Sequence, residues 1–205
     1  QRFANESQNY MAFQKDLFKT HTPEHPNAPA WHVFDATFRE NFMVGPLMTK
    51  AMKPDSQIPK KWFDEGFVAK ANTIRELADM LGIDADGLEE TIGKMNHYAE
   101  TGKDEDFGRG DSAYDRYYAD PAIKPNPCLA PIIKAPFYAM RIEAGDFGTL
   151  GGLDTDTVAR VKKADGGVFE GLFAVGNCSA AILPTYPGPG ATLGPAMTMA
   201  YQAAR

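Results

Sequence analysis

The chain has 205 residues, enough for one large domain or two small ones with a buried core. Hydrophobic residues make up 43% and charged residues 23%, an ordinary globular composition that excludes a disordered tail. The net charge of -6, with scattered lysines and arginines, argues against nucleic acid binding, so we expect a small-molecule ligand.

Other bulk features narrow the class further. No apolar run reaches the ~20 residues that span a bilayer, so we expect no transmembrane segment and a cytoplasmic location, with peripheral membrane association left open. Cys128 and Cys178 lack CxxC spacing and are interpreted as small buried apolar side chains. The chain begins with Gln1 and ends inside a predicted helix, so we expect both ends to be cut.

The first predicted element is an amphipathic helix over residues 6–20, because Tyr10, Phe13, Leu17 and Phe18 recur at spacings of three and four. A short strand at 31–35 and a helical turn at 38–42 follow. The proline-broken segment 45–61 has no periodicity. Four apolar side chains in or beside it suit either a pocket for a bulky apolar ligand or ordinary core, namely Met43, Leu47, Met48 and Met52.

Two helices with clear end signals come next. Asn72 or Thr73 caps the first, Glu76 completes a capping box with Thr73, and Gly82 ends it. The second runs from 84–86 to Gly102 and buries a stripe made of Leu88, Ile92, Met95 and Tyr98. We interpret the acidic run 104–106 as a solvated turn, and no metal site is expected.

The last third of the sequence changes character. A strand is predicted at 137–142, followed by glycine-bounded short strands that include a hairpin over 159–169. Residues 171–177 are almost wholly apolar, which predicts a strand buried on both faces of an α/β sheet. Because one strand cannot form a sheet, its partners must lie elsewhere.

The stretch TYPGPGATLGP at 185–195, which leads into a helix predicted over 196–204, is the most informative. Its prolines fix φ and its glycines permit dihedrals that side chains would block, so the loop should be stiff. Such a loop presents the Tyr186 hydroxyl beside the Gly190 N–H, which suits an oxyanion hole for a ketone that enolises. The helix start that follows suits the anionic edge of a reduced flavin. A rigid turn without chemistry is the alternative interpretation.

Six segments carry a family resemblance. They are RFANESQNY, WHVFD, DEDFGRGDSAYDRYYADPAIKPNPCLAPI, GDFGTLGGLDTD, GLFAVGNCSA and TYPGPGATLGPAMT. In this wording, over nearly its whole length, the chain resembles the 3-ketosteroid Δ1-dehydrogenases. These are FAD-dependent flavoproteins of the fumarate reductase and succinate dehydrogenase superfamily.

The resemblance implies a fold of mixed class, α+β with α/β. Residues 1–147 would form a substrate-binding (catalytic) domain, incomplete at its N-terminus, and residues 148–205 the C-terminal segment of a discontinuous Rossmann-like FAD-binding domain. There is no GxGxxG opening and no acidic ribose partner. The expected partners are therefore an N-terminal FAD-binding half, in the same or a separate chain, a 3-ketosteroid and a quinone-type electron acceptor.

The family's reaction forms a C1–C2 double bond in the steroid A ring, with a hydride passing from C1 to flavin N5 and a proton from C2 to a tyrosine. By resemblance, Tyr186 and the Gly190 N–H hold the C3 ketone and Tyr10 is the base, with Tyr117 and Tyr118 as weaker rivals and a further tyrosine outside this chain. The positions that match FAD contacts are Gly151, Gly152, Gly176, Asn177, Thr192 and Leu193.

Three rival functions stay open. One is a fumarate-reductase-like enzyme for unsaturated carboxylates, although TYPGPG replaces the expected HGxNRxGG-type wording. The second is a sister flavoprotein that oxidises another cyclic ketone. The third is a non-catalytic substrate-binding subunit. In each case we expect the chain alone to be colourless, poorly folded and inactive.

Overall fold

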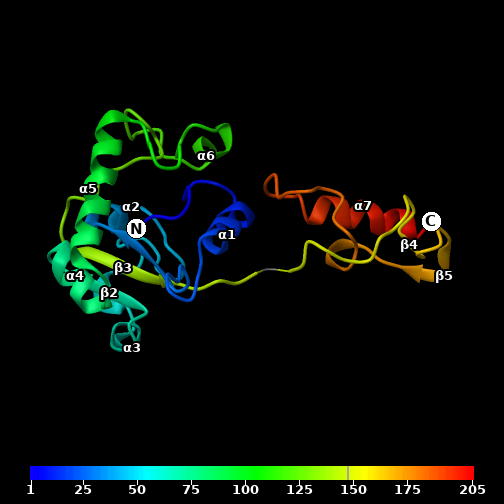
Figure 1. Cartoon of the computed structure of the whole chain (residues 1–205), viewed down its shortest axis with the longest axis horizontal. Helices are drawn as coiled ribbons and strands as arrows, with labels where there is room; N and C mark the ends of the chain where they lie inside the picture. The colour runs from blue at the N-terminus through cyan, green and yellow to red at the C-terminus, as the bar shows by residue number, and fades with distance from the viewer. Residues whose placement is uncertain (147) are drawn as a thin grey trace. The chain divides into compact units, whose positions relative to one another are not determined.

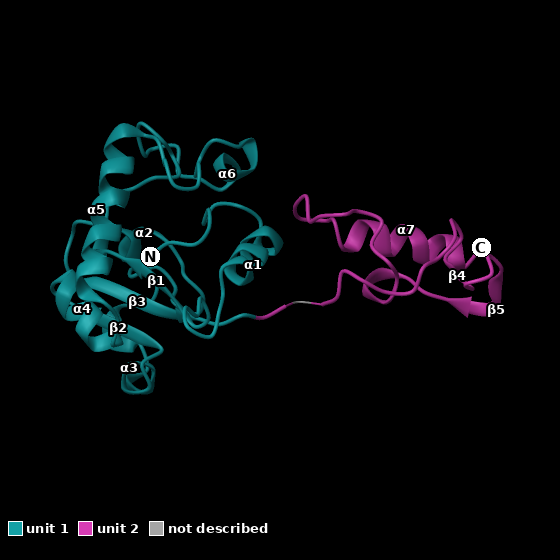
Figure 2. Cartoon of the chain, in the orientation of Figure 1, with its two compact units in different colours: residues 1–144 teal, residues 145–205 magenta. Residues whose placement is uncertain are grey.

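The computed structural model describes residues 1–146 and 148–205. The chain divides into two compact units, unit 1 at Gln1–Ala144 and unit 2 at Gly145–Arg205 (Figure 2). The expected domain boundary at 147/148 falls beside Phe147, which lies outside the described residues, and it stays a prediction. Each unit is described by itself below.

Unit 1 is built around a three-stranded sheet with the order β1-β3-β2 (Figure 1). The strands are β1 (Ala30–Phe34), β2 (Val68–Ala71) and β3 (Phe137–Ile142), and both outer strands run antiparallel to β3. The bounds predicted for β3 are confirmed. The predicted strand at 31–35 ends at Phe34, because the Asp35 carboxylate accepts the Phe38 N–H and caps the next helix.

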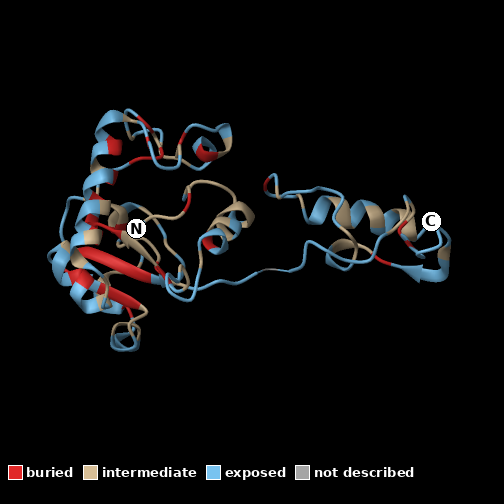
Figure 3. Cartoon of the chain, viewed as in Figure 1, coloured by how far each residue is buried: buried red, intermediate tan, exposed pale blue. Residues whose placement is uncertain are grey.

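The two faces of the central strand carry two different cores, since successive residues of a strand point to opposite sides. Tyr138 and Met140 belong to one cluster, with Phe34, Leu47, Ile58 and Val68. Phe137 and Ala139 belong to the other, with Ala69, Ala71 and Leu77. Figure 3 shows β3 as the most continuously buried ribbon of this unit. Of the residues considered for an apolar pocket, Leu47 is core, whereas Met43 and Met52 are exposed.

The two helices with clear end signals form as predicted. α4 (Ile74–Leu81) begins at Thr73, whose side chain and that of Glu76 complete the capping box, and ends at Gly82 with φ of 66°. α5 (Ala85–Thr101) begins at Asp84 and ends at Gly102 with φ of 77°. The predicted stripe of α5 is buried along its whole length.

Unit 1 contains further helices. They are α1 (Tyr10–Lys19), α2 (Ala36–Asn41), the 3-10 helix η1 (Asp55–Gln57), α3 (Lys60–Asp64) and α6 (Ala113–Tyr117). α1 starts later than predicted because Asn9 caps it. Its predicted inward stripe is partly wrong. Leu17 is buried, but Tyr10 and Phe18 are 49% and 50% exposed within this chain.

Unit 2 contains β4 (Arg160–Lys162), β5 (Val168–Phe173), the 3-10 helix η2 (Gly176–Cys178) and α7 (Leu193–Ala203). The predicted hairpin is confirmed as the antiparallel pair β4–β5. The strand expected at 171–177, buried on both faces, is wrong for this chain. β5 ends at Phe173 and is largely exposed, because a two-stranded ribbon covers neither of its faces.

One further prediction is wrong. Cys178 is exposed at the end of η2, whereas Cys128 is buried as expected. Within the residues that the structure describes, no helix is both long and apolar enough to cross a membrane.

Candidate functional site

The two glycines of the pair at 151 and 152 have different surroundings. The Leu153 N–H donates to the Cys178 carbonyl at 3.0 Å, and the Ala180 N–H donates to the Leu153 carbonyl at 2.8 Å. A Cβ on Gly152 would lie 2.6 Å from the Cys178 carbonyl oxygen, whereas a Cβ on Gly151 would meet open space. Gly152 is therefore required by the close approach of two backbones.

The segment around Gly176 joins this pair to α7. Gly176 has φ of 60°, and a Cβ there would lie 3.4 Å from the Ala196 side chain. The Thr149 hydroxyl donates to the Asn177 carbonyl at 2.7 Å. The segments around residues 150, 177 and 193 that we expect to face the flavin thus contact one another inside unit 2.

α7 begins at Leu193, three residues before the predicted start. Pro195 lies in its first turn, where a proline costs no hydrogen bond. The N-cap Thr192 makes no side-chain capping bond, and Leu193 is 69% exposed. The positive end of the helix dipole is therefore open at the protein surface, as the anionic edge of a flavin requires.

The loop before α7 is closed by its own backbone. The Gly190 carbonyl accepts the Gly194 N–H at 2.8 Å, and the Gly188 carbonyl accepts the Ala191 N–H at 3.2 Å. Gly188 and Gly190 have φ of 142° and 92°, values that favour glycine. Tyr186 is half-buried and Gly190 is exposed. The proline-flanked loop is thus fixed onto the start of the helix.

The third candidate residue of the reaction lies in the other unit. Tyr10 is the first residue of α1. Because the units are described separately, the structure sets no distance between Tyr10 and Tyr186. The rival residues Tyr117 and Tyr118 are 75% and 67% exposed, with their rings in a T-shaped contact at 4.7 Å between centroids.

The acidic run at 104–106 leads into a turn as predicted, and Glu105 and Asp106 are exposed, but Asp104 is not solvated. Asp104 is 3% exposed, and both of its carboxylate oxygens accept from the Arg2 guanidinium at 2.9 and 2.8 Å. It also accepts the backbone N–H groups of Asp106, Phe107 and Arg109. The burial of Asp104 was not predicted because its partner, Arg2, lies 102 positions away in the sequence.

A second buried carboxylate lies close by in the same loop. Asp115 accepts from the Asn5 carboxamide and from the Gly110 N–H, each at 2.9 Å, and from the Ser112 hydroxyl at 2.7 Å. Burial alone would raise the pKa of Asp115, but these donors outweigh burial and hold it below the usual value. Asp115 is therefore charged at neutral pH.

A shallow cleft of about 410 Å³ separates the start of α1 from this loop. Polar and apolar groups both line it, with aromatic rings at two positions: Asn5, Gln8, Asn9, Ala12, Phe107, Gly108, Asp111, Ser112, Tyr114 and Asp115. Sequence reasoning missed both the cleft and the two buried carboxylates. The one available signal was that both segments involved, RFANESQNY and DEDFGRGDS, belong to the stretches that resemble the family.

In the part of the chain that the structure describes, no group of three or more His, Cys, Asp or Glu side chains is placed to hold a metal ion. The open helix start, the close-packed glycines and the stiff loop suit an organic cofactor with an anionic edge. A sequence-family model described as "FAD binding domain" matches residues 1–193 of this chain.

The chain belongs to the FAD binding domain family.

Similar members of the family include two curated bacterial enzymes. The chain is 45% identical to the 3-oxosteroid 1-dehydrogenase of Mycolicibacterium smegmatis, over 99% of this chain and 36% of the relative. It is 43% identical to the 4-oxocyclohexanecarboxylate 2-dehydrogenase of Sinomonas cyclohexanicum, over 100% of this chain and 34% of the relative. The chain thus spans about a third of the length of these curated relatives.

A solved structure gives the same result for the fold. The 3-ketosteroid Δ1-dehydrogenase of Sterolibacterium denitrificans, in complex with 1,4-androstadiene-3,17-dione, has a TM-score of 0.92 and 45% identity to this chain. The match covers 100% of this chain and 36% of that one. The mixed helix and sheet fold of this family member is therefore that of part of a flavoprotein dehydrogenase.

Proposed function

We propose that this chain is the substrate-binding and flavin-capping part of a dehydrogenase that introduces the C1–C2 double bond of 3-ketosteroids. The observation that carries the proposal is the loop after Tyr186, where the Gly188 and Gly190 carbonyls accept backbone bonds that fix the loop onto the open start of α7. A ketone held by this loop and a flavin at the helix start would be neighbours. The 45% identity to a 3-oxosteroid 1-dehydrogenase supports the same substrate class.

The positions proposed to hold the isoalloxazine end of FAD all lie in unit 2. They are Gly151, Gly152, Gly176, Asn177, Thr192 and Leu193. Open space above Gly151 and the uncapped Thr192 fit a flat ring whose edge carries negative charge. When bound, FAD accepts the hydride that leaves C1 of the steroid.

The protein's own residues would act on the ketone and on the proton. The Tyr186 hydroxyl and the Gly190 N–H donate to the C3 oxygen and stabilise the negative charge that grows there. C2–H becomes more acidic, and the Tyr10 oxygen would take the C2 proton, which leaves the C2–H electrons in an enolate held at the C3 oxygen. These electrons would then form the C1–C2 double bond as the hydride leaves C1. An ordinary phenol has a pKa of about 10, so this base needs help, which we assign to a tyrosine of the N-terminal half.

A partner half is supported by the surface of unit 2. Among its described residues, the buried apolar side chains are Ala159, Val161 and Ala174. Large apolar side chains are exposed on β5 and α7, namely Phe169, Leu172, Phe173, Leu193, Met197 and Tyr201. We propose that an N-terminal FAD-binding half covers them and completes a discontinuous Rossmann-like domain. A quinone-type acceptor and a cytoplasmic location, with or without peripheral membrane association, belong to this proposal.

A second candidate function is the oxidation of a smaller cyclic ketone. It is favoured by the 43% identity to a 4-oxocyclohexanecarboxylate 2-dehydrogenase, which nearly equals the identity to the steroid enzyme. Both reactions place a ketone next to the carbon that loses a proton, so the Tyr186 loop fits either. The size of the ring system distinguishes them.

The test is single-turnover reduction of FAD in the complete flavoprotein that contains this chain, followed by loss of the 450 nm absorbance. We expect 4-androstene-3,17-dione to reduce the flavin and 4-oxocyclohexanecarboxylate to do so much more slowly. Tyr186→Phe should lower the rate about 10²–10³-fold, because it removes one oxyanion donor.

The control is Tyr98→Phe, which removes the hydroxyl of a core tyrosine on α5 to which no role in the reaction is assigned, and it should leave the rate unchanged. Faster reduction by the cyclohexanone would favour the second candidate. Reduction by neither ketone would contradict both, and it would favour the fumarate-reductase-like or the non-catalytic alternative.

A further inference from the structure

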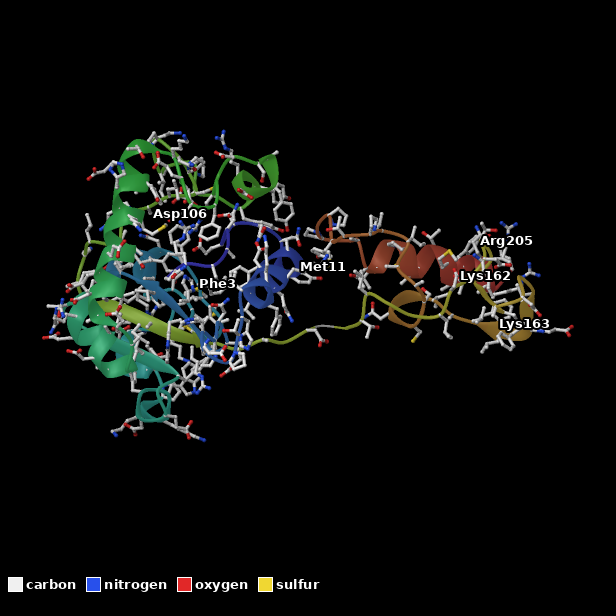
Figure 4. All side chains as sticks on the ribbon, viewed as in Figure 1. Phe3, Met11, Asp106, Lys162, Lys163 and Arg205 are labelled. Atoms are coloured by element: carbon white, nitrogen blue, oxygen red, sulfur yellow. The ribbon has the colours of Figure 1, made fainter. Side chains whose placement is uncertain are left out.

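The segment before Tyr10 has no helix or strand of its own, and side chains hold it in place. Arg2 makes two hydrogen bonds to Asp104, whose side chain is fully buried. Arg109 donates from Nε to the Ser7 hydroxyl at 2.9 Å. In Figure 4, Phe3 marks this N-terminal segment and Asp106 marks the loop after α5 that holds it.

Asn5 links the segment before Tyr10 to a buried carboxylate. Its Nδ2 donates to the Asp115 carboxylate at 2.9 Å, and its Oδ1 accepts the Ser7 N–H at 2.9 Å. Asn9 then accepts the Ala12 N–H at 2.9 Å and sets the start of α1. A short series of fixed turns therefore connects a buried charge to Tyr10.

The carboxylate at the far end is itself fixed. Asp115 is 5% exposed and receives the Gly110 N–H and the Ser112 hydroxyl besides Asn5. Gly110 has φ of 93°, and a Cβ there would lie 2.3 Å from the Asn126 side chain, so the loop has little room to shift. The hydrogen bond from Asn5 is charge-assisted, which makes it stronger than a bond between neutral groups.

We propose that Asp115, acting through Asn5, is a positioning residue for Tyr10 in proton removal from C2, an inference that rests on the proposed role of Tyr10. The Tyr10 side chain is half-exposed. The fixed backbone before it restrains where that side chain can lie. A misplacement of about 1 Å can cost about 10²-fold in rate, so loosening this restraint slows proton removal selectively.

The experiment uses two variants of the complete flavoprotein, Asn5→Ala and Asp115→Asn. The kinetic isotope effects of a C2-deuterated and a C1-deuterated 3-ketosteroid are measured on each. We expect kcat to fall about 10–100-fold with KM within about twofold. We also expect the C2 isotope effect to rise and the C1 effect to fall, because proton removal becomes the slower step.

The matched control is Asn96→Ala. Asn96 also makes side-chain bonds to a distant backbone, accepting the Ile132 N–H at 2.7 Å and donating to the Ile132 carbonyl at 3.3 Å, but it does not touch the segment before Tyr10. Its isotope effects should equal those of the wild type. If Asn5→Ala and Asp115→Asn lose activity with unchanged isotope effects, their role is structural and the proposal is overturned. Asn5→Ala, the milder change, keeps the test decisive should Asp115→Asn fail to fold.

Tyr10→Phe separates this inference from the proposed function. Enzyme-catalysed exchange of the C2 hydrogen in D₂O should disappear in this variant. If exchange survives, Tyr10 is not the base, and the inference fails with that assignment. If exchange disappears while Asn5→Ala leaves both isotope effects unchanged, the base stands and the positioning role alone is wrong.

Discussion

At the scale of single residues, His32 on β1 is the clearest case of an environment that sets a charge. Its ring lies 5.4 Å from that of Phe34 and 5.6 Å from that of Phe38, between centroids. Burial, reinforced by the positive charge of Arg109, lowers the pKa of His32 to about 4. The side chain is therefore neutral at pH 7.

The pH dependence of stability follows from this shift. The unfolded histidine has a pKa of 6.5, so it binds a proton before the folded one does as the pH falls. The contribution of neutral His32 to the free energy of unfolding is complete above pH 6.5. It is lost as the pH falls from 6.5 to 4, by at most about 3 kcal/mol. We expect amide protection of β1 in the complete flavoprotein to fall in this window. This loss of amide protection should be absent in His32→Gln. It should be the same as in the wild type in His97→Gln, a control at an exposed histidine.

Gly152 gives a second prediction at this scale. Gly152→Ala would push a methyl group into the Cys178 and Ser179 backbone, whereas Gly151→Ala meets open space. We expect the Leu153 and Ala180 amides, which form the affected backbone bonds, to exchange at least tenfold faster in Gly152→Ala. Their exchange should be close to wild type in Gly151→Ala. Equal exchange in both variants would contradict the close approach described for unit 2.

At the scale of elements, the start of α4 decides between two caps that the sequence left open. The Thr73 hydroxyl accepts the Glu76 N–H at 3.1 Å, and the Glu76 carboxylate accepts the Thr73 N–H at 3.2 Å. Thr73→Ala should destabilise the helix by about 1 kcal/mol, measured as faster exchange of α4 amides. Asn72→Ala should have less than half that effect. A larger effect at Asn72 would mean that the helix starts elsewhere.

Elements were predictable where local chemistry determines their ends. α4 and α5 carry capping side chains and terminal glycines, and β3 alternates between two apolar faces, so all three follow from short stretches of sequence. β2 was missed because its four residues carry no such signal, and it exists through pairing with β3. α1 was predicted to start too early because the cap at Asn9 was not recognised within the polar run 6–9.

The candidate site divides in the same way. The loop Tyr186–Gly190 was identifiable because its prolines and glycines restrict the backbone within a few residues. Asp104 and Asp115 were misread or missed because their partners, Arg2 and Asn5, lie 102 and 110 positions away. Long-range pairs between polar groups leave no periodic pattern in a single sequence.

At the scale of the whole molecule, the two units differ in what they bury. Unit 1 has cores on both faces of its sheet, whereas unit 2 exposes apolar side chains on β5 and α7 (Figure 3). A surface of this kind is costly in water, so we propose that an FAD-binding half covers it. In that proposed complete flavoprotein, unit 2 would join the cofactor to the ketone.

The most direct measurement is a crystal structure of that complete flavoprotein with a bound 3-ketosteroid. We predict that the C3 oxygen lies about 3 Å from both the Tyr186 hydroxyl and the Gly190 nitrogen. The start of α7 should face the isoalloxazine. A steroid whose ketone oxygen lies far from both donors, or an α7 whose start points away from the flavin, would contradict the assignment.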